Sequence, residues 1–165
     1  DLKIAGVSGL TLIPPLLDID FVAFTREPAI EVAGWASLAP LNVGIVRGWK
    51  VLEQNITGTR SLVRTKTSAL LFGLLRNGRI DVAVIDRASG IATARQMAIS
   101  DIRLSQRPLV RRPMYLHLHN RHDKLVEPLA RALMDMKADG TFARIHAATL
   151  GAYLTDETAA KSVER

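Results

Sequence analysis

The sequence predicts an α/β protein built around a doubly wound, mainly parallel sheet. Between residues 41 and 109, apolar runs of strand length alternate with segments of helical periodicity. One of these runs, Ile80 to Asp86, is apolar almost throughout, as is typical of a strand covered on both faces. Successive strand–helix repeats of this kind favour parallel strands joined by right-handed crossovers.

The first 25 residues are expected to contain only short extended pieces. Pro14 and Pro15 prevent one continuous element through residues 1–20, which we interpret as strand fragments and loop. Phe21 to Thr25 is an apolar, β-prone run that must end before Pro28, and it is predicted to be a strand.

Two strand–helix steps follow. An apolar strand covering residues 42–47 stops at Gly48, and a helix over residues 49–56 follows it. Residues 61–65 form the next strand. Thr67 can then cap a helix that ends at Gly78, because four leucines fall on one face of that segment: Leu70, Leu71, Leu74 and Leu75.

The remaining elements are assigned by the same periodicities. The strand over residues 80–86 precedes a helix over residues 88–98 and a short strand at 102–104. Residues 113–119 alternate apolar and polar side chains, which predicts one further strand.

A long helix is expected to start at Asp123 as N-cap and to run to Gly140. Pro128 lies in its first turn, and Leu125, Leu129, Leu133 and Met136 form its apolar stripe. Thr141 can cap a last helix over residues 142–150, and residues 155–165 form a polar tail.

Composition narrows the function classes. The chain has 165 residues with 22 Lys and Arg against 16 Asp and Glu, a net charge of +6 that suits an anionic partner. Nucleic acid is not the expected partner, because the basic residues are scattered and two Trp, two Tyr and four Phe are too few for a base-stacking platform. Cysteine is absent, which excludes disulfides and thiolate sites.

Neither a metal nor another cofactor is expected. His117, His119 and His122 lie close in sequence, but Arg121 and Lys124 beside them would repel a cation. The glycine-rich and nucleophile motifs of common hydrolases, kinases and dinucleotide-binding enzymes are also missing from the sequence, which favours binding without catalysis.

Three phrases of the sequence resemble a known family. Residues 38–48, Leu-Ala-Pro-Leu-Asn-Val-Gly-Ile-Val-Arg-Gly, are similar to the entry into the second lobe of type 2 periplasmic solute-binding proteins. Residues 74–86 resemble the family's L-x-x-G-R-x-D-x-x-x-x-D segment, and residues 136–142 resemble its late helix–turn–helix phrase. The resemblance is to the amino-acid-binding (family 3) members that serve ABC transporters, and it covers roughly residues 21–150.

The resemblance implies a division of the chain. Residues 1–25 would be a short remnant of lobe 1 with the first hinge strand, and residues 26–111 would be lobe 2. Residues 112–150 would supply the second hinge strand and helices returning to lobe 1, followed by a tail over residues 151–165. Such proteins usually spend many more residues on lobe 1, so this lobe is expected to be incomplete.

The resemblance also implies a function. The chain would capture an amino acid or a similar small polar carboxylate in the periplasm by hinge closure and present it to the membrane permease of an ABC transporter. Two alternatives stay open: the ligand-sensing domain of a receptor or transcription regulator, and a lyase or transferase on the same fold.

Seven residues are predicted to bind the solute. Arg47, Gly48 and Trp49 stand where a strand delivers the chain to a helix start, whose free N–H groups favour an anion such as a carboxylate. The alternative is that Gly48 merely permits the turn and Trp49 packs in the core.

The other four lie after two further strands. Asp86 ends a buried strand and suits an ammonium group, and the resemblance gives it the solute's amino group; alternatively it caps the next helix or pairs with Arg87. Three side chains between a strand end and a helix start could hydrogen-bond a carboxylate: Arg64, Thr65 and Thr67. Arg26 is a weaker candidate for the same role.

Overall fold

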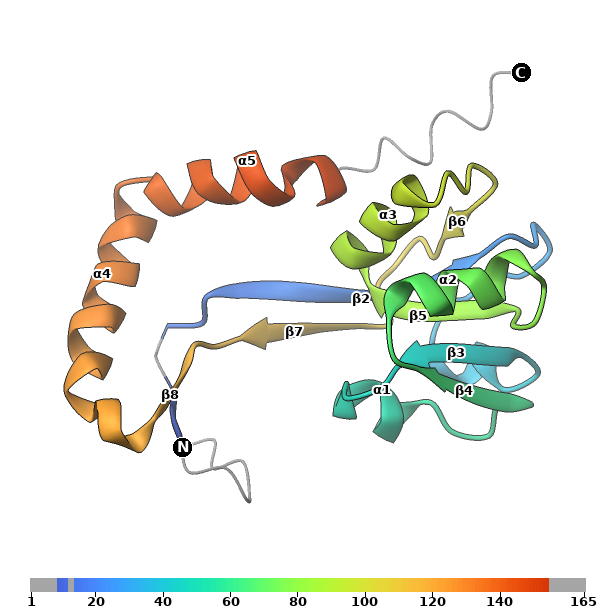
Figure 1. The fold of residues 1–165 in the computed structure, drawn as a ribbon, viewed down its shortest axis with the longest axis horizontal. Coiled ribbons are helices and arrows are strands. Elements are labelled where there is room, and N and C mark those ends of the chain that lie inside the picture. Colours follow the sequence, from blue (N-terminus) through green and yellow to red (C-terminus); the bar gives the residue numbers. More distant parts are fainter. Residues whose placement is uncertain (1–8, 12–13, 155–165) are drawn as a thin grey trace. The chain divides into compact units, whose positions relative to one another are not determined.

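The computed structural model describes residues 9–11 and 14–154, and it divides the chain into two compact units. Unit 1 comprises Asp1–Ile19 and Arg112–Ala152, and unit 2 comprises Asp20–Arg111 and Tyr153–Arg165. The chain therefore crosses between the units at three places: inside strands β2 (Leu17–Thr25) and β7 (Val110–Met114), and near the end of helix α5 (Thr141–Leu154) (Figure 1).

A mixed sheet forms the centre of unit 2. Its strand order is β4 (Ser61–Thr65), β3 (Asn42–Val46), β5 (Val82–Asp86), β2 and β6 (Arg103–Leu104), and β7 also pairs with β2. Strand β3 lies between β4 and β5 and is parallel to both, whereas β2 is antiparallel to β5 and β6. The predicted α/β class with a mainly parallel sheet is thus confirmed for β3, β4 and β5.

Helices connect the parallel strands. Helix α1 (Lys50–Asn55) follows β3, α2 (Ser68–Arg76) follows β4, and α3 (Arg87–Gln96) follows β5, while the 3-10 helix η1 (Trp35–Leu38) precedes β3. Thr67 caps α2 as predicted, because its side chain accepts a hydrogen bond from Leu70 N. In Figure 1, α2 and α3 lie on one side of the sheet and α1 on the other.

Both faces of this sheet are buried, which explains the uniform apolarity of β5. Val22 and Phe24 of β2 join one hydrophobic cluster with Ala83 and Ile85 of β5 and with the buried side of α2 and α3. Because successive strand residues point to opposite faces, their neighbours belong to the other face. These neighbours are almost completely buried as well: Phe21, Ala23, Val82 and Val84.

Unit 1 is smaller and loosely packed. Strand β1 (Gly9–Thr11) pairs antiparallel with β8 (His117–His119) in a two-stranded sheet. After β8 come the 3-10 helix η2 (Asn120–Leu125), α4 (Val126–Ala138) and α5 (Thr141–Leu154). Within residues 14–19 and 112–152, Leu133 is the one side chain classed as buried.

Three sequence-based expectations in unit 1 are wrong. The single strand predicted over residues 113–119 is two strands, β7 and β8, which pair with different partners. Asp123 is not the N-cap of the long helix: it lies inside η2 with its Oδ1 accepting from Lys124 N, and α4 starts three residues later. Leu125 and Leu129 of the predicted apolar stripe are exposed.

Other expectations concern residues that the structure does not cover. The tail over residues 155–165 and much of the opening segment, residues 1–8 and 12–13, lie outside the described residues. Among the helices that the structure does describe, none is long and apolar enough to cross a membrane.

Candidate functional site

The register of the parallel strands brings the predicted site residues to one edge of the sheet in unit 2. Val46 of β3 pairs with Thr65 of β4, and Arg47 N donates to Thr65 O at 3.0 Å. Ile45 pairs with Val84 of β5, so continuing that register by two residues places Arg47 beside Asp86. Neighbouring strands lie about 4.8 Å apart, so the carboxyl ends of β3, β4 and β5 form one continuous edge.

The turn after β3 depends on Gly48. Its φ of +101° lies in a region that side chains with a Cβ rarely adopt. Arg47 and Gly48 are exposed. Gly48 N donates to Glu53 Oε1 at 3.4 Å, so a carboxylate of the chain itself occupies this donor. A solute carboxylate would have to compete with Glu53 there.

Trp49 packs against the sheet. Its ring meets the ring of Phe21 edge-on, with centroids 4.9 Å apart and an interplanar angle of 72°. Trp49 is half-buried, whereas Phe21 is completely buried. The contact fits the alternative that Trp49 packs in the core, although the residue stays partly exposed.

The three candidate residues at the end of β4 differ in how exposed they are. Thr65 is buried, and its Oγ1 lies 3.2 Å from Ile45 O and 3.0 Å from Thr67 O. Thr67 is exposed, and although its Oγ1 accepts from Leu70 N at 3.2 Å, its own hydroxyl proton is still available. Arg64 is half exposed and lies 4.0 Å from Glu53 Oε1. Thr67 and Arg64 are therefore better placed than Thr65 to meet a solute.

Asp86 caps helix α3. Its Oδ1 accepts a hydrogen bond from Ser89 N at 2.9 Å, which is the alternative that the sequence left open. Capping uses one carboxylate oxygen. Asp86 is only partly buried, and it forms no ion pair with any residue in the part of the chain that the structure covers. The second oxygen can thus receive a solute ammonium while the first holds the helix.

Sequence reasoning missed an ion pair at the same edge. Asp20 precedes Phe21, the residue paired with Asp86, and its carboxylate accepts from Arg111 Nε at 2.6 Å and Arg111 Nη2 at 2.8 Å. The hydrogen bond from Arg111 lowers the pKa of Asp20 against the opposing effect of burial, and the charges of Arg111 and Arg87 lower it further. No local pattern reveals a pair separated by 91 positions in sequence.

Arg26 belongs to the other end of the sheet. Because β2 runs antiparallel to β5, Thr25 and Arg26 lie near the amino end of β5, where Thr25 Oγ1 donates to Asp81 O. Arg26 Nε donates to Asp101 Oδ2 at 2.8 Å, and its Nη1 donates to Arg76 O. The suggestion that Arg26 contributes to the solute site is therefore wrong.

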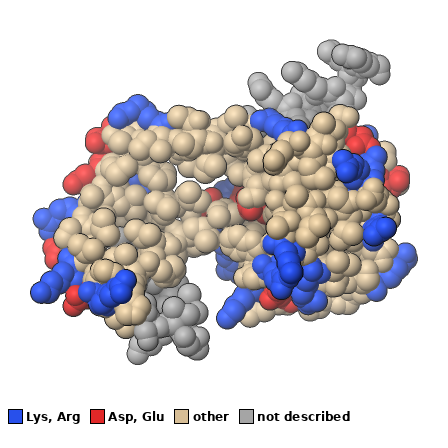
Figure 2. All heavy atoms as spheres, in the orientation of Figure 1, with Lys and Arg blue, Asp and Glu red and all other residues tan. Residues whose placement is uncertain are grey.

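Basic side chains dominate the exposed surface around the turn after β3. Figure 2 shows Lys and Arg gathered over the part of unit 2 that carries α1. Arg47, Lys50 and Arg64 are exposed in this region, and Glu53 is the acidic residue among them. An anionic group approaching the carboxyl edge would be attracted.

No family model matches the chain, but comparison with known sequences finds a relative. A protein of Shewanella oneidensis described as uncharacterized is 30% identical over 144 residues, which is 79% of this chain. The chain spans about half of that relative, 52% of its length.

Solved structures give a stronger likeness in fold. An ancestral arginine-binding protein bound to glutamine has a TM-score of 0.73 and 19% identity, covering 87% of this chain and 64% of its own. The GluR0 ligand-binding core with L-glutamate has a TM-score of 0.77 and 14% identity, covering 88% and 66%. A histidine kinase sensor domain similar to periplasmic binding proteins has a TM-score of 0.72 and 22% identity, covering 87% and 68%.

Proposed function

Because the chain has the fold of type 2 periplasmic binding proteins, as the sequence predicts, we propose that it binds a small polar solute, an amino acid or a related carboxylate. The site is the carboxyl edge of β3, β4 and β5 in unit 2. Arg47, Arg64 and Thr67 hold the carboxylate of the solute, and Asp86 holds its ammonium group.

One observation supports this proposal: the parallel register pairs Ile45 with Val84, and the same register continued by two residues would set Arg47 beside Asp86. Open α/β sheets bind ligands at the carboxyl ends of their strands, and here that edge carries groups of both signs. Side chains of opposite charge on neighbouring strands suit the two ends of an α-amino acid. In the proposed site, Gly48 forms the turn after β3 and Trp49 forms one wall.

The wider role follows the same proposal. The chain would act without catalysis as the solute-binding component of an ABC-type transporter in the periplasm, closing about its hinge strands and presenting the solute to a membrane permease. The likeness to a histidine kinase sensor domain favours a second candidate, a ligand-sensing domain. Both roles require the same binding step, so that step is tested first.

The test measures binding to the purified chain. Thermal-shift screening against amino acids and organic acids, followed by calorimetry with the best hit, should give saturable binding by one molecule. Asp86→Asn should weaken binding of an amino acid by about 2 kcal/mol, since it removes one partner of a charge pair but retains a capping side chain. Binding of the matching organic acid, which lacks the ammonium group, should change little.

The control is Asp101→Asn, which removes a carboxylate at the opposite end of unit 2. It should leave affinity unchanged. The proposal fails if no compound in the screen shifts the unfolding temperature, or if Asp86→Asn binds the amino acid as tightly as the parent chain.

A further inference from the structure

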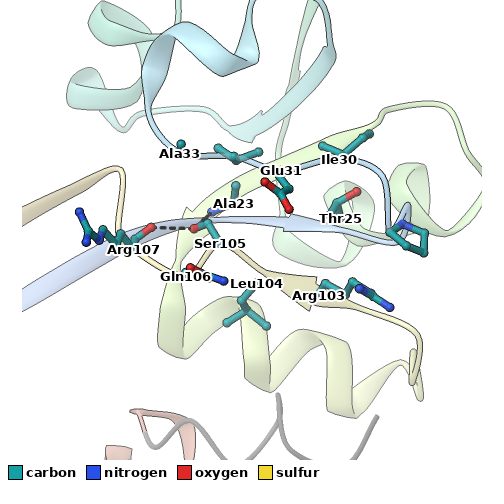
Figure 3. A pocket seen from close by; sticks show the side chains of 12 residues that line it. Ala23, Thr25, Ile30, Glu31, Ala33, Arg103, Leu104, Ser105, Gln106 and Arg107 are labelled. Atoms are coloured by element: carbon teal, nitrogen blue, oxygen red, sulfur yellow. Dashed lines mark hydrogen bonds between the residues drawn. The ribbon is translucent and has the colours of Figure 1, made fainter. Parts of the chain in front are cut away.

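A pocket of about 420 Å³ opens in unit 2 away from the candidate site. Its walls are Pro28 and residues 30–33, in the loop after β2, and residues 103–107, in and after β6. Ala23 and Thr25 of β2 form the floor (Figure 3). None of the seven predicted site residues lines it. The volume falls in the range of about 300–1,000 Å³ that is usual for small-molecule sites.

An interruption of the sheet creates one wall of this pocket. Ser105 N donates to Ala23 O at 2.9 Å, as expected from the register of β6 with β2. A regular ladder would next use Arg107, but Phe21 O accepts from Leu109 N, two positions later. The segment between these bonds therefore leaves the line of β2, an irregularity that is over-represented beside functional sites.

The Ser105 hydroxyl stabilises this irregular segment. Its Oγ accepts from Ala23 N at 3.2 Å and donates to Arg107 O at 2.9 Å, the latter drawn as a dashed line in Figure 3. Thr25 Oγ1 is also engaged, accepting from Glu27 N and donating to Asp81 O. The hydroxyl groups of the pocket are thus committed to the fold, which leaves four other polar side chains for recognition: Glu31, Arg103, Gln106 and Arg107.

Three charged side chains of the pocket have no ion-pair partner among the residues that the structure describes: Glu31, Arg103 and Arg107. In Figure 3 the Glu31 carboxylate points from its loop toward β2 and Ser105. Arg103 and Arg107 stand at opposite ends of the facing segment. The pocket thus carries one carboxylate between two arginines, whose guanidinium groups point outward at its two ends in this view.

These charges favour one ligand class. A simple carboxylate would pair with the arginines but leave Glu31 without a partner, and a simple amine would pair with Glu31 but leave both arginines without one. A molecule with both groups satisfies both signs, and Ile30 and Val32 offer an apolar wall to an aliphatic side chain. We propose that this pocket is a second ligand site, which takes a small aliphatic zwitterion such as an α-amino acid with a branched side chain.

The pocket does not depend on the solute site at the carboxyl edge, so the two can be tested separately. The probe is L-leucine, added to the ¹⁵N-labelled full chain, with isovalerate lacking the ammonium group and 3-methylbutylamine lacking the carboxylate. Leucine should shift the amide signals of residues 30–33 and 105–107. Either fragment should bind about tenfold more weakly, the factor expected when one charged hydrogen bond is lost.

Two variants assign the charges, and both alter exposed side chains. Glu31→Gln should weaken the binding of leucine about tenfold, so that leucine no longer binds more tightly than isovalerate. In the double variant Arg103→Gln/Arg107→Gln, leucine should no longer bind more tightly than 3-methylbutylamine. Asp86→Asn is the control, and it should leave the shifts of residues 105–107 unchanged.

Three results would overturn the proposal: leucine leaves the signals of residues 30–33 and 105–107 unmoved, both charge variants bind leucine like the parent, or Asp86→Asn abolishes these shifts. The last result would assign the shifts to the carboxyl-edge site instead. If Asp86→Asn loses binding at the carboxyl edge but keeps the shifts of the pocket residues, the two sites bind independently.

Discussion

Asp86 combines a structural and a proposed binding role in one side chain. One carboxylate oxygen closes the first turn of α3 through Ser89 N, and this bond fixes the direction of the group at the sheet edge. A side chain held in place by a helix cap loses little conformational entropy when a ligand arrives. The capping role therefore supports the proposed binding role rather than replacing it.

Stability measurements can separate these two roles. Asp86→Ala removes the cap and should lower the free energy of unfolding by about 1 kcal/mol, whereas Asp86→Asn caps equally well and should lower it by only a few tenths of that amount. Urea denaturation followed by circular dichroism measures both. Equal losses in the two variants would mean that the charge of Asp86, rather than its cap, stabilises unit 2.

The ion pair of Asp20 with Arg111 predicts a pH-dependent contribution to stability. The pKa of Asp20 is lowered in the folded protein, chiefly by the hydrogen bond from Arg111. The pair therefore stabilises the protein at pH values above the ordinary pKa of aspartate. That stabilisation is lost as the pH falls through the unfolded pKa, near pH 4, toward the folded one. Asp20→Asn should therefore cost on the order of 1 kcal/mol at pH 7 and progressively less below about pH 4.

Denaturation of the parent and Asp20→Asn across pH 2 to 8 measures this difference. Glu127→Gln is the comparison, because its partner Arg131 lies one helical turn away and both side chains are largely exposed. A difference between parent and Asp20→Asn that stays constant down to pH 2 would contradict the ionic explanation.

Local sequence signals identified some residues at the edge and not others. Thr67 and Asp86 follow strands and precede helices, so their positions and capping ability could be predicted from neighbouring residues. Burial of the Thr65 hydroxyl could not, because it depends on Ile45 O in another strand. The partnership of Asp20 with Arg111 likewise arises only when distant segments meet.

At the scale of the element, the packing of α3 on β2 rests on Gly90. A Cβ at this position would lie 2.2 Å from the Phe24 ring, which is completely buried and meets Phe72 edge-on. Gly90→Ala should therefore destabilise the protein by about 1–3 kcal/mol, since the core must shift to admit the methyl group. Thermal and urea unfolding measure the loss.

Gly73 in α2 provides the matched control. A Cβ there would meet nothing within 4 Å, so Gly73→Ala should stabilise the protein by roughly 0.5–1 kcal/mol through helix propensity alone. If both substitutions changed stability by the same amount, close packing of α3 against Phe24 would not be the cause.

Periodicity predicted the elements of unit 2 better than those of unit 1. In unit 2 each apolar run meets a neighbouring strand and a covering helix, so its pattern agrees with its surroundings. Residues 113–119 alternate as one strand would, but their hydrogen-bonding partners change from β2 to β1 within the run. Alternation specifies which side chains share a face and does not specify the partner strand.

At the scale of the whole molecule, the two units differ in how much apolar surface they bury. Unit 2 contains a continuous cluster of buried side chains on α2, α3, β2 and β5. Within residues 14–19 and 112–152 of unit 1, Leu133 is the one buried side chain, and several large apolar side chains of η2, α4 and α5 are exposed: Leu125, Leu129, Met134 and Ile145. Local stability should follow this difference.

Hydrogen exchange tests that expectation with two helices of the same chain. Helix α4 is 13 residues long and buries one side chain, whereas α2 is 9 residues long and buries Leu71, Phe72 and Leu75. Intrinsic helix stability rises with length, so propensity alone would make α4 the better protected of the two. Because tertiary packing supplies most helical stability in proteins, we expect the amides of α4 to exchange orders of magnitude faster than those of α2 under native conditions. Exchange followed by mass spectrometry reports both helices at once, and protection of α4 equal to that of α2 would show that unit 1 gains stability from contacts other than a buried core.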